Sequence, residues 1–208
     1  MLTLYLTRHG ETQWNIENRL QGSKDSELTS KGIEDAKRLS NMLSEVSFNK
    51  IYTSSSKRAV TTANLLRNNL ITPIIEVDGL KEINFGDWEG KTKFEINERS
   101  KKEFSSLWDS PHLYDHSPHS GESLIALRYR IANVIQNILN SNEEGNLLIV
   151  THAVVLATIV AYFKQSPLEN LWDLPFVHGT SLTIINVDQE KRLIDFSLLC
   201  DISHLDIT

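Results

Sequence analysis

Residues 4–15 decide how this sequence is interpreted, and they read LYLTRHGETQWN. The short apolar run stops at Arg8, His9 and Gly10, which is the pattern of a buried β-strand that delivers a cation and an imidazole to its carboxyl end. Glycine lets the backbone turn tightly there, and open α/β sheets bind ligands at this edge. Because a guanidinium fork matches phosphate oxygens and an imidazole can attack phosphorus, the pair suits a phosphate.

The size and composition fit an ordinary globular protein. The chain has 208 residues, of which 40% are hydrophobic and 23% charged, a length typical of one domain. It has 21 basic and 27 acidic side chains, for a net charge of −6, and no dense Lys/Arg block. No nucleic-acid partner is therefore expected, and the sequence predicts no particular oligomeric state.

The number of cysteines and the length of the apolar runs indicate the cellular compartment of the protein. Cys200 is the only cysteine, which fits a reducing environment. The longest apolar run, Ala153–Phe163, is too short to cross a bilayer, and no basic and apolar leader precedes the first strand. We expect a cytoplasmic protein without a membrane partner.

Strand-like and helical patterns alternate along the chain. Strands are predicted at Leu2–Thr7, Lys50–Thr53, Pro73–Val77, Asn146–Thr151, Ser181–Val187 and Leu193–Cys200. Helical periodicity covers Lys31–Leu43, Arg58–Leu70, Ser123–Leu139 and Ala153–Phe163. A capping box is expected at Ser166–Glu169, and a hairpin turn at Asp188–Lys191. The alternation predicts a three-layer α/β/α fold whose central sheet is mostly parallel, with an antiparallel edge.

Three later segments also place polar residues where a strand ends or a helix begins. The serines of Ser54–Ser56 precede Arg58, a combination that binds phosphate through helix N–H groups and a guanidinium together. Glu82 stands among apolar residues, where desolvation raises the pKa of a carboxyl group towards the range of proton transfer; Glu89 competes for that role. His152 follows a second buried strand. Each residue alone has an ordinary structural explanation, but together they predict a phosphate site.

With these segments in place, the sequence resembles the histidine phosphatase superfamily, the phosphoglycerate mutase-like enzymes. The matching motifs include Arg8–Thr12, Trp14-Asn15, Gln21-Gly22, Ser54-Ser55, Arg58-Ala59, Thr62-Ala63, Glu82, Trp88–Gly90, Gly121–Ser123 and Val150–His152. The sequence is most similar to the compact branch of broad-specificity bacterial phosphatases, through Pro111–Tyr114 and Ser166–Asp188. The resemblance implies a single domain over residues 1–208, with residues 91–121 as a helical and loop lid insertion.

The resemblance also implies a mechanism. His9 is the expected nucleophile and becomes a phosphohistidine, while Glu82 protonates the leaving oxygen and then activates water. The phosphoryl group is expected to be bound by Arg8, Arg58, His152 and Asn15. No metal or cofactor is expected, because these groups supply the positive charge that phosphoryl transfer needs. A hydrogen bond from the second nitrogen of His9 to a backbone carbonyl is expected to fix its tautomer.

The residues of the substrate pocket indicate whether hydrolysis or mutase action is favoured. It is expected to be lined by Gln21, Gly22, Phe85, Trp108, Leu113, Tyr114 and Ala153. Mutases of the family hold the substrate carboxylate with an adjacent arginine pair, but this chain has no arginine between Arg99 and Arg128. Phe85 stands where mutases have a tyrosine, and Ala153 follows the second histidine where they have glycine. Lys93, in contrast, matches a mutase lysine.

We therefore predict a phosphatase that hydrolyses phosphomonoesters of small metabolites. The alternatives are a 2,3-bisphosphoglycerate-dependent phosphoglycerate mutase and a dedicated metabolite phosphatase such as α-ribazole phosphate phosphatase. A more distant alternative is a phosphate-binding module without catalysis.

The segment Asp109–Gly121 carries His112, His116 and His119 together with aspartate, residue types that also bind zinc. Two prolines interrupt it and no second ligand cluster follows, so a surface loop is favoured over a metal site. Long loops in compact domains often act as lids. We expect this one to cover the phosphate pocket, with Leu113 or Tyr114 facing the substrate.

Overall fold

A mixed β-sheet forms the centre of the protein, whose computed structural model describes residues 1–67 and 70–206. The strands are β1 (Leu2–Arg8), β2 (Phe48–Thr53), β3 (Ile74–Glu76), β4 (Gly145–Thr151), β5 (Leu182–Asp188) and β6 (Leu193–Asp201). They are ordered β3-β2-β4-β1-β5-β6. The first four run parallel, and β5 is antiparallel to both β1 and β6. The predicted parallel sheet with an antiparallel edge is confirmed, as is the hairpin.

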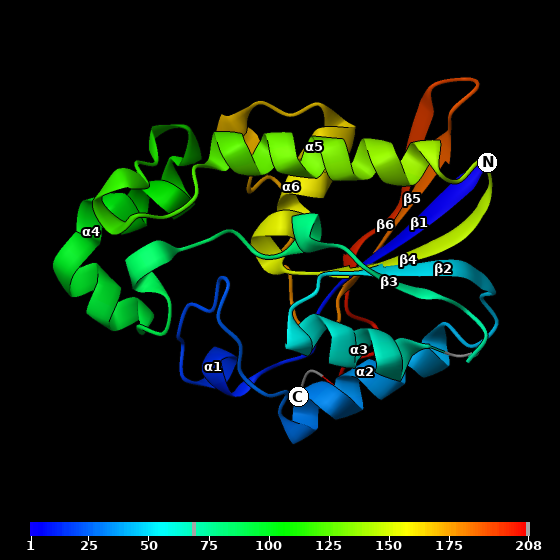
Figure 1. Ribbon diagram of the computed structural model, residues 1–208, viewed down its shortest axis with the longest axis horizontal. Helices are drawn as coiled ribbons and strands as arrows, with labels where there is room; N and C mark the ends of the chain where they lie inside the picture. Colours follow the sequence, from blue (N-terminus) through cyan, green and yellow to red (C-terminus); the bar gives the residue numbers. More distant parts are fainter. Residues whose placement is uncertain (68–69, 207–208) are drawn as a thin grey trace.

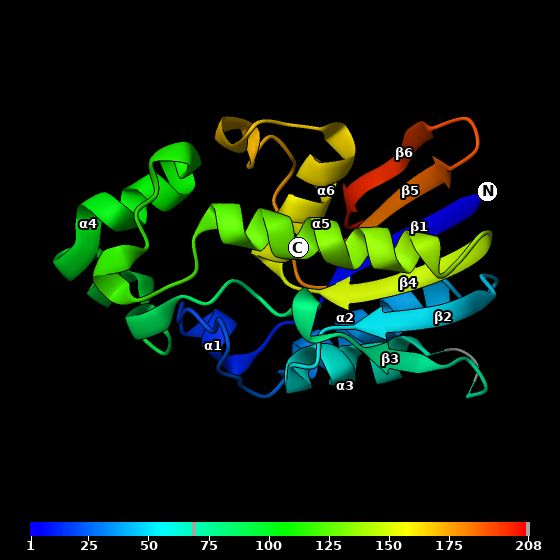
Figure 2. The ribbon, with the colours of Figure 1, turned by 45° about the horizontal axis from the view of Figure 1, so that its top comes forward.

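Helices cover both faces of this sheet, which confirms the three-layer prediction. Helices α2 (Ser30–Met42) and α3 (Lys57–Leu66) lie on one face, and α5 (Leu124–Asn140) and α6 (Ala153–Lys164) lie on the other (Figure 1). The short α1 (Gln13–Ile16) and the longer α4 (Lys93–Asp109) lie beyond the sheet, on the side to which the arrowheads of β2 and β4 point (Figure 2). That side holds the carboxyl ends of the parallel strands.

Short 3₁₀ helices connect the main elements. They are η1 (Asp78–Leu80), η2 (Gly86–Trp88), η3 (Pro111–Leu113), η4 (Ser117–His119) and η5 (Leu168–Asn170). Within the described ranges, no helix has the length and apolar character needed to traverse a lipid bilayer.

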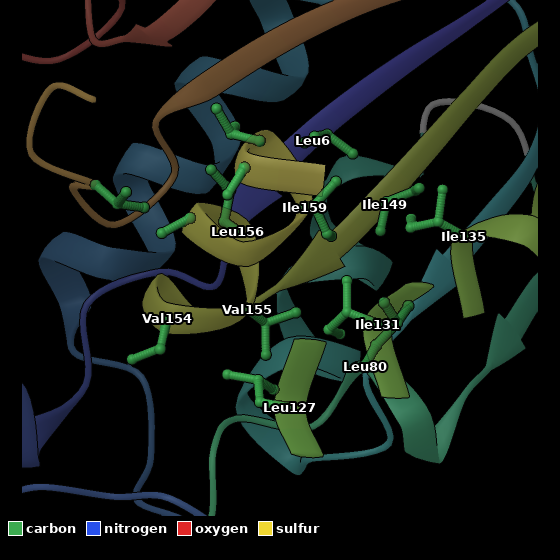
Figure 3. Packing of buried hydrophobic residues seen from close by; sticks show 14 of the residues in the cluster. Leu6, Leu80, Leu127, Ile131, Ile135, Ile149, Val154, Val155, Leu156 and Ile159 are labelled. Atoms are coloured by element: carbon green, nitrogen blue, oxygen red, sulfur yellow. The ribbon is translucent and has the colours of Figure 1, made fainter. Parts of the chain in front are cut away.

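The core has two parts because the sheet is buried on both faces. Side chains alternate along β4, so that Leu147 and Ile149 pack on one side while Leu148 and Val150 pack on the other. Helix α6 is apolar almost all round, and its side chains pack in one cluster with side chains of α5 and of the sheet (Figure 3). This packing fixes the carboxyl ends of β1 and β4 side by side.

Two sequence predictions about chain segments are wrong. The helix predicted to reach Leu70 ends at Leu66; Leu66 is fully buried whereas Leu70 is 83% exposed and contributes nothing to the core. Residues 68–69 of that prediction lie outside the described residues. The expected capping box at Ser166–Glu169 does not form either. The chain instead turns through Gln165 at φ 53° into η5, whose N-cap Pro167 has no side-chain oxygen to offer.

Candidate active site

A cavity of about 820 Å³ opens at the carboxyl ends of β1 and β4. It brings together most of the residues predicted for the site. The predicted catalytic and phosphate-binding residues on its wall are Arg8, His9, Asn15, Arg58 and Glu82. The predicted substrate-pocket residues on its wall are Gln21, Gly22, Phe85, Trp108 and Ala153.

One ring nitrogen of His9 bonds to the backbone, which sets the tautomer of the neutral ring. Its ring is 3% exposed, and Nδ1 lies 2.8 Å from the carbonyl oxygen of Gly10. Because a carbonyl only accepts, Nδ1 carries the proton and Nε2 keeps its lone pair. Burial lowers the pKa of His9 well below its usual value, and the charges of Arg58 and Arg8 lower it further. The predicted tautomer-fixing hydrogen bond is confirmed.

Two arginines give the cavity its positive charge. Arg8 donates from Nη1 to the carbonyl of Val177 at 2.9 Å. Arg58 is 2% exposed, and its Nη1 forms a 3.0 Å ion pair with Asp25. Over residues 1–67 and 70–206, the Nε atoms of both arginines are buried without a hydrogen-bond partner. Buried donors are normally satisfied, so these two favour an anionic ligand in the cavity.

His152 lies behind the cavity wall and is fully buried. Its ring centroid is 5.1 Å from that of His9. Nδ1 is 3.1 Å from Nη2 of Arg58, and Nε2 is 2.8 Å from Oγ of Ser54. In this arrangement His152 supports Arg58 and does not itself face the cavity, and its predicted contact with phosphate stays a prediction.

Glu82 provides a carboxyl group with a raised pKa on the cavity wall. Its Oε1 accepts from the N–H of Ile83 at 3.0 Å and its Oε2 accepts from the N–H of Val154 at 3.2 Å. Burial raises the pKa of Glu82, although the two N–H groups and the nearby arginines oppose the shift. A carboxyl group of this kind can donate a proton and take it back at a higher pH than an ordinary glutamate.

The position of Glu82 is fixed by a neighbouring ion pair. Arg130 donates to the carbonyls of Gly79 and Lys81 at 2.8 Å each, and its guanidinium binds both carboxylate oxygens of Glu122. The bidentate geometry orients the guanidinium firmly. The segment that carries Glu82 is therefore tied to the start of α5.

Glu89, the alternative carboxylate, has a structural role. It does not line the cavity, and its Oε1 accepts from the backbone N–H groups of Ser23 at 2.8 Å and Phe85 at 3.2 Å. A carboxylate occupied in this way holds two loops together, which favours Glu82, a residue of the cavity wall, over Glu89 for the acid role.

The loop that follows α1 forms one side of the cavity. The side-chain oxygen of Asn15 accepts from the N–H of Thr12 at 3.1 Å, so its Nδ2 amide group is the donor available to a ligand. Gln21 donates to the hydroxyl of Thr12 at 2.8 Å. Gly22 has a φ of 56°, and a side chain there would meet the carboxylate of Glu89; its carbonyl accepts from Arg58 at 2.9 Å.

A group of apolar and aromatic residues, here called the apolar wall, lines the same cavity as the charged groups. It comprises Phe104, Trp108, Trp172, Leu174, Pro175 and Phe176. The rings of Trp108 and Trp172 have centroids 5.1 Å apart, and Nε1 of Trp172 donates to the carbonyl of Leu107 at 2.9 Å. The sequence analysis missed the contribution of residues 172–179, which have no regular periodicity. Two aromatic residues in an irregular segment were the available signal.

Leu113 and Tyr114 were predicted to face the substrate, but neither lines the cavity, and their contact with substrate stays a prediction. Leu113 is 67% exposed, and the hydroxyl of Tyr114 lies 3.0 Å from Nε2 of His119. His119 stacks on Trp88 with centroids 3.6 Å apart and bonds through Nδ1 to the carbonyl of Phe85 at 2.9 Å. The segment therefore packs beneath the cavity wall because His119 binds it to η2.

The zinc alternative finds no support in the geometry. His112 is exposed, whereas His116 bonds to the carbonyl of Gly121 at 3.1 Å. Across the part of the chain that the structure describes, no three or more His, Cys, Asp or Glu side chains converge in a way that could hold a metal ion.

Comparison with known proteins identifies the family. Residues 4–197 match the family model described as histidine phosphatase superfamily (branch 1). The chain is 32% identical to the adenosylcobalamin/alpha-ribazole phosphatase of Escherichia coli K12, over 82% of this chain and 83% of that protein. It is 26% identical to phosphoserine phosphatase 1 of Hydrogenobacter thermophilus, over 93% and 90% of the two chains.

A solved structure agrees with this assignment. Bacillus stearothermophilus YhfR is 46% identical, with a TM-score of 0.91 over 98% of this chain and 99% of that one. The resemblance seen in the sequence and the expected enzyme class, a phosphoric monoester hydrolase, are thereby confirmed. The chain belongs to the histidine phosphatase superfamily, branch 1.

Proposed function

We propose that this protein is a metal-independent phosphatase that hydrolyses phosphomonoesters of small metabolites through a phosphohistidine at His9. One observation supports it most strongly: an unprotonated His9 Nε2, two arginines with unpaired buried donors and a Glu82 carboxyl group with a raised pKa share one cavity. Phosphoryl transfer depends on such positioning and on positive charge around the phosphoryl oxygens.

In the first step, the lone pair of His9 Nε2 attacks phosphorus while the bond from phosphorus to the leaving oxygen breaks. Arg8 and Arg58 stabilise the charge that spreads over the equatorial oxygens, with Asn15 as a further donor. Protonated Glu82 gives its proton to the leaving oxygen. The alcohol leaves, and the phosphoryl group remains on Nε2.

In the second step, water attacks the same phosphorus from the side that the alcohol has left. Glu82, now a carboxylate, takes a proton from that water. The phosphorus–nitrogen bond breaks and returns the electron pair to Nε2 of His9. Inorganic phosphate leaves, and His9 and Glu82 are restored to their starting protonation states.

We also propose that substrates have a substantial apolar part, since the aromatic residues of the wall line the same cavity as the phosphate-binding groups. Residues 91–121 act as a lid insertion in this proposal, contributing Phe104 and Trp108 from α4. Burial of an aromatic group against such a wall contributes favourable free energy without fixing a single substrate.

Phosphoglycerate mutase action is the second candidate, favoured by one observation: the exposed Lys93 at the start of α4 lines the cavity and offers a cation for a substrate carboxylate. Against it, the position three residues after Glu82, where mutases of the family have a tyrosine, is Phe85, which has no hydroxyl. Incubation with 3-phosphoglycerate, with and without 2,3-bisphosphoglycerate, separates the two. We expect inorganic phosphate and no 2-phosphoglycerate.

The proposed activity is tested with p-nitrophenyl phosphate in excess EDTA. Wild-type protein is expected to release nitrophenolate at the same rate with and without the chelator, and His9→Asn is expected to release none. Loss of wild-type activity in EDTA, with recovery on adding a divalent metal, would contradict a metal-independent mechanism.

The apolar wall is tested by Trp108→Ala against Phe94→Ala. Both residues are aromatic and lie on α4, but Phe94 is 73% exposed and outside the cavity. We expect Trp108→Ala to lower kcat/KM about tenfold for naphthyl phosphate and much less for glycerol phosphate, as expected for lost aromatic burial. Equal losses on both substrates would contradict a role in selecting apolar groups.

A further inference from the structure

Ser54 is buried at the end of β2 and its hydroxyl contacts the ring of His152. The backbone N–H of Ser54 donates to Val150 at 2.9 Å, next to the strand end that carries His152. Its Oγ lies 2.8 Å from Nε2 of His152 and 3.2 Å from Oγ of Ser56. Ser54 does not line the cavity, so a direct contact with substrate does not explain this arrangement.

The hydrogen bonds around His152 permit only one neutral tautomer. Arg58 has donors and no acceptor, so the 3.1 Å contact with Nη2 requires an unprotonated Nδ1. The proton of neutral His152 is then on Nε2, and the Ser54 hydroxyl accepts it. The Ser54 hydroxyl donates its own hydrogen to Oγ of Ser56 at 3.2 Å and also accepts from the backbone N–H of Ser56 at 3.3 Å.

His152 in turn completes the set of partners of Arg58. Nη1 donates to the carbonyl of Lys24 at 2.7 Å and to Asp25 at 3.0 Å. Nη2 donates to the carbonyl of Gly22 at 2.9 Å and to His152. All four Nη hydrogens therefore have protein acceptors, and Nε is the donor without one. The planar guanidinium is fixed with Nε free for an anion.

We propose that Ser54 is a positioning residue for the phosphate site. It holds His152 in the Nε2–H tautomer, and that tautomer orients Arg58. Without the Ser54 hydroxyl, the Nε2–H group of His152 has no acceptor. If the proton of His152 moved to Nδ1, that N–H group would face the Nη2–H group of Arg58, and neither donor would have an acceptor. The guanidinium would then turn away from the orientation that serves the phosphoryl group.

The experiment compares Ser54→Ala with Ser56→Ala. Both serines are buried, at 0% and 5% exposure, but Ser56 does not touch His152 and makes no side-chain cap to α3. The tautomer is read from the ¹⁵N shifts of the His152 ring in histidine-labelled protein, assigned with His152→Asn. Affinity for inorganic phosphate is measured by calorimetry, and kcat/KM is measured on p-nitrophenyl phosphate. Circular dichroism checks that each variant is folded.

We expect Ser54→Ala to lose the Nε2–H signature and to weaken phosphate affinity and kcat/KM by about tenfold, the scale at which supporting partners of a site ligand act. Ser56→Ala should stay within about twofold of wild type. Ser54→Thr, which keeps the hydroxyl, should restore the tautomer and at least part of the affinity. If Ser54→Ala does not fold, Ser54→Cys is compared with Ser54→Thr instead. Because sulfur is a weaker acceptor than oxygen, Ser54→Cys should bind phosphate less tightly than Ser54→Thr.

The proposal is overturned if Ser54→Ala keeps the tautomer, or if it loses the tautomer while phosphate affinity and kcat/KM match those of Ser56→Ala. Only the kinetic readout rests on the proposed phosphatase function. A wild-type protein that binds phosphate but hydrolyses no phosphomonoester would contradict that function, whereas the tautomer and the affinity would still decide the role of Ser54.

Discussion

His9 and Glu82 face the same cavity with pKa values shifted in opposite directions. Burial and two neighbouring arginines lower the pKa of His9, whereas burial raises that of Glu82. The imidazole is thus kept neutral and nucleophilic while the carboxyl group retains a proton at higher pH than a surface glutamate. Opposed shifts of this kind are how a site assigns one group to attack and another to proton transfer.

The acid role of Glu82 predicts a dependence on the leaving group. Glu82→Gln should lower kcat/KM by about 10² for an alkyl phosphate, the usual contribution of general acid catalysis. It should lower kcat/KM far less for p-nitrophenyl phosphate, because nitrophenolate leaves without a proton. Glu89→Gln serves as the comparison, and equal losses on both substrates in Glu82→Gln would argue against proton donation.

The same assignment predicts the shape of the pH profile. Wild-type kcat/KM for an alkyl phosphate should fall on the alkaline side as Glu82 loses its proton, at a pH above the ordinary range of glutamate because its pKa is raised. Steady-state rates across pH measure this limb. An alkaline limb that persists unchanged in Glu82→Gln would belong to another group.

Individual residues were predictable where a local pattern carries them. Arg8 and His9 end an apolar run, so the sequence alone places them at a strand terminus. His152 follows a second apolar run and is placed at a strand terminus in the same way. The local pattern alone did not separate Glu82 from Glu89, and only the family resemblance favoured Glu82. The separation depends on which carboxylate meets the N–H groups of Ser23 and Phe85. The partners of His152 were likewise hidden, since Ser54 and Arg58 reach it only through the pairing of β2 with β4.

At the scale of elements, the loop before α2 supports the start of α3. The side chain of the N-cap Ser56 makes no capping hydrogen bond to the helix backbone. Asp25 supplies the missing acceptor, with one carboxylate oxygen 2.7 Å from the N–H of Lys57 and the other 3.2 Å from the N–H of Arg58. Because Asp25 also binds the guanidinium of Arg58, one carboxylate both caps the helix and orients a phosphate-binding side chain.

This double role gives Asp25→Ala two expected effects. The free energy of unfolding should fall by ~1 kcal/mol for the lost cap, and the KM for p-nitrophenyl phosphate should rise. Glu27→Ala is the matched control, because Glu27 pairs with the side chain of Lys57 where both are more than 70% exposed, and exposed pairs contribute little. Urea unfolding and steady-state kinetics measure the two effects. An unchanged KM in Asp25→Ala would show that Asp25 caps the helix without supporting phosphate binding.

Elements were predicted well where apolar periodicity is long, as in α5 and α6, and less well where packing decides an end. The sequence pattern of α3 continues to Leu70, but Leu66 is the last residue of this segment that packs in the core. The irregular segment 172–179 contributes much of the cavity wall, yet it has no periodicity from which its position could be inferred. Its placement depends on the contact of Trp172 with α4.

At the scale of the whole molecule, building the site costs stability that depends on pH. His9 and His152 are buried with pKa values well below the usual one. Between those lowered values and ~6.5, the unfolded chain binds protons that the folded chain does not. The free energy of unfolding therefore rises with pH in this window. The stability that the two neutral histidines contribute is fully present above ~6.5 and is lost as the pH falls towards their lowered pKa values. The raised pKa of Glu82 acts in the opposite sense.

We expect urea unfolding to show lower stability at about pH 5.5 than at about pH 7.5, by at most ~1.4 kcal/mol per pH unit for each fully buried histidine below its unfolded pKa. His9→Asn removes one of the two groups and keeps a donor for the Gly10 carbonyl, so its stability should depend less steeply on pH. A variant with the same pH dependence as wild type would show that His9 titrates similarly in the folded and unfolded chains.

The covalent role of His9 is the central claim, and rapid-quench trapping of the phosphoenzyme tests it most directly. Wild-type protein mixed with a phosphomonoester, quenched in alkali and analysed by mass spectrometry should carry one acid-labile, alkali-stable phosphoryl group on the peptide that contains His9. His9→Asn should carry none. Turnover by wild-type protein with no phosphorylated peptide at any quench time, or with the phosphoryl group on another residue, would contradict the account.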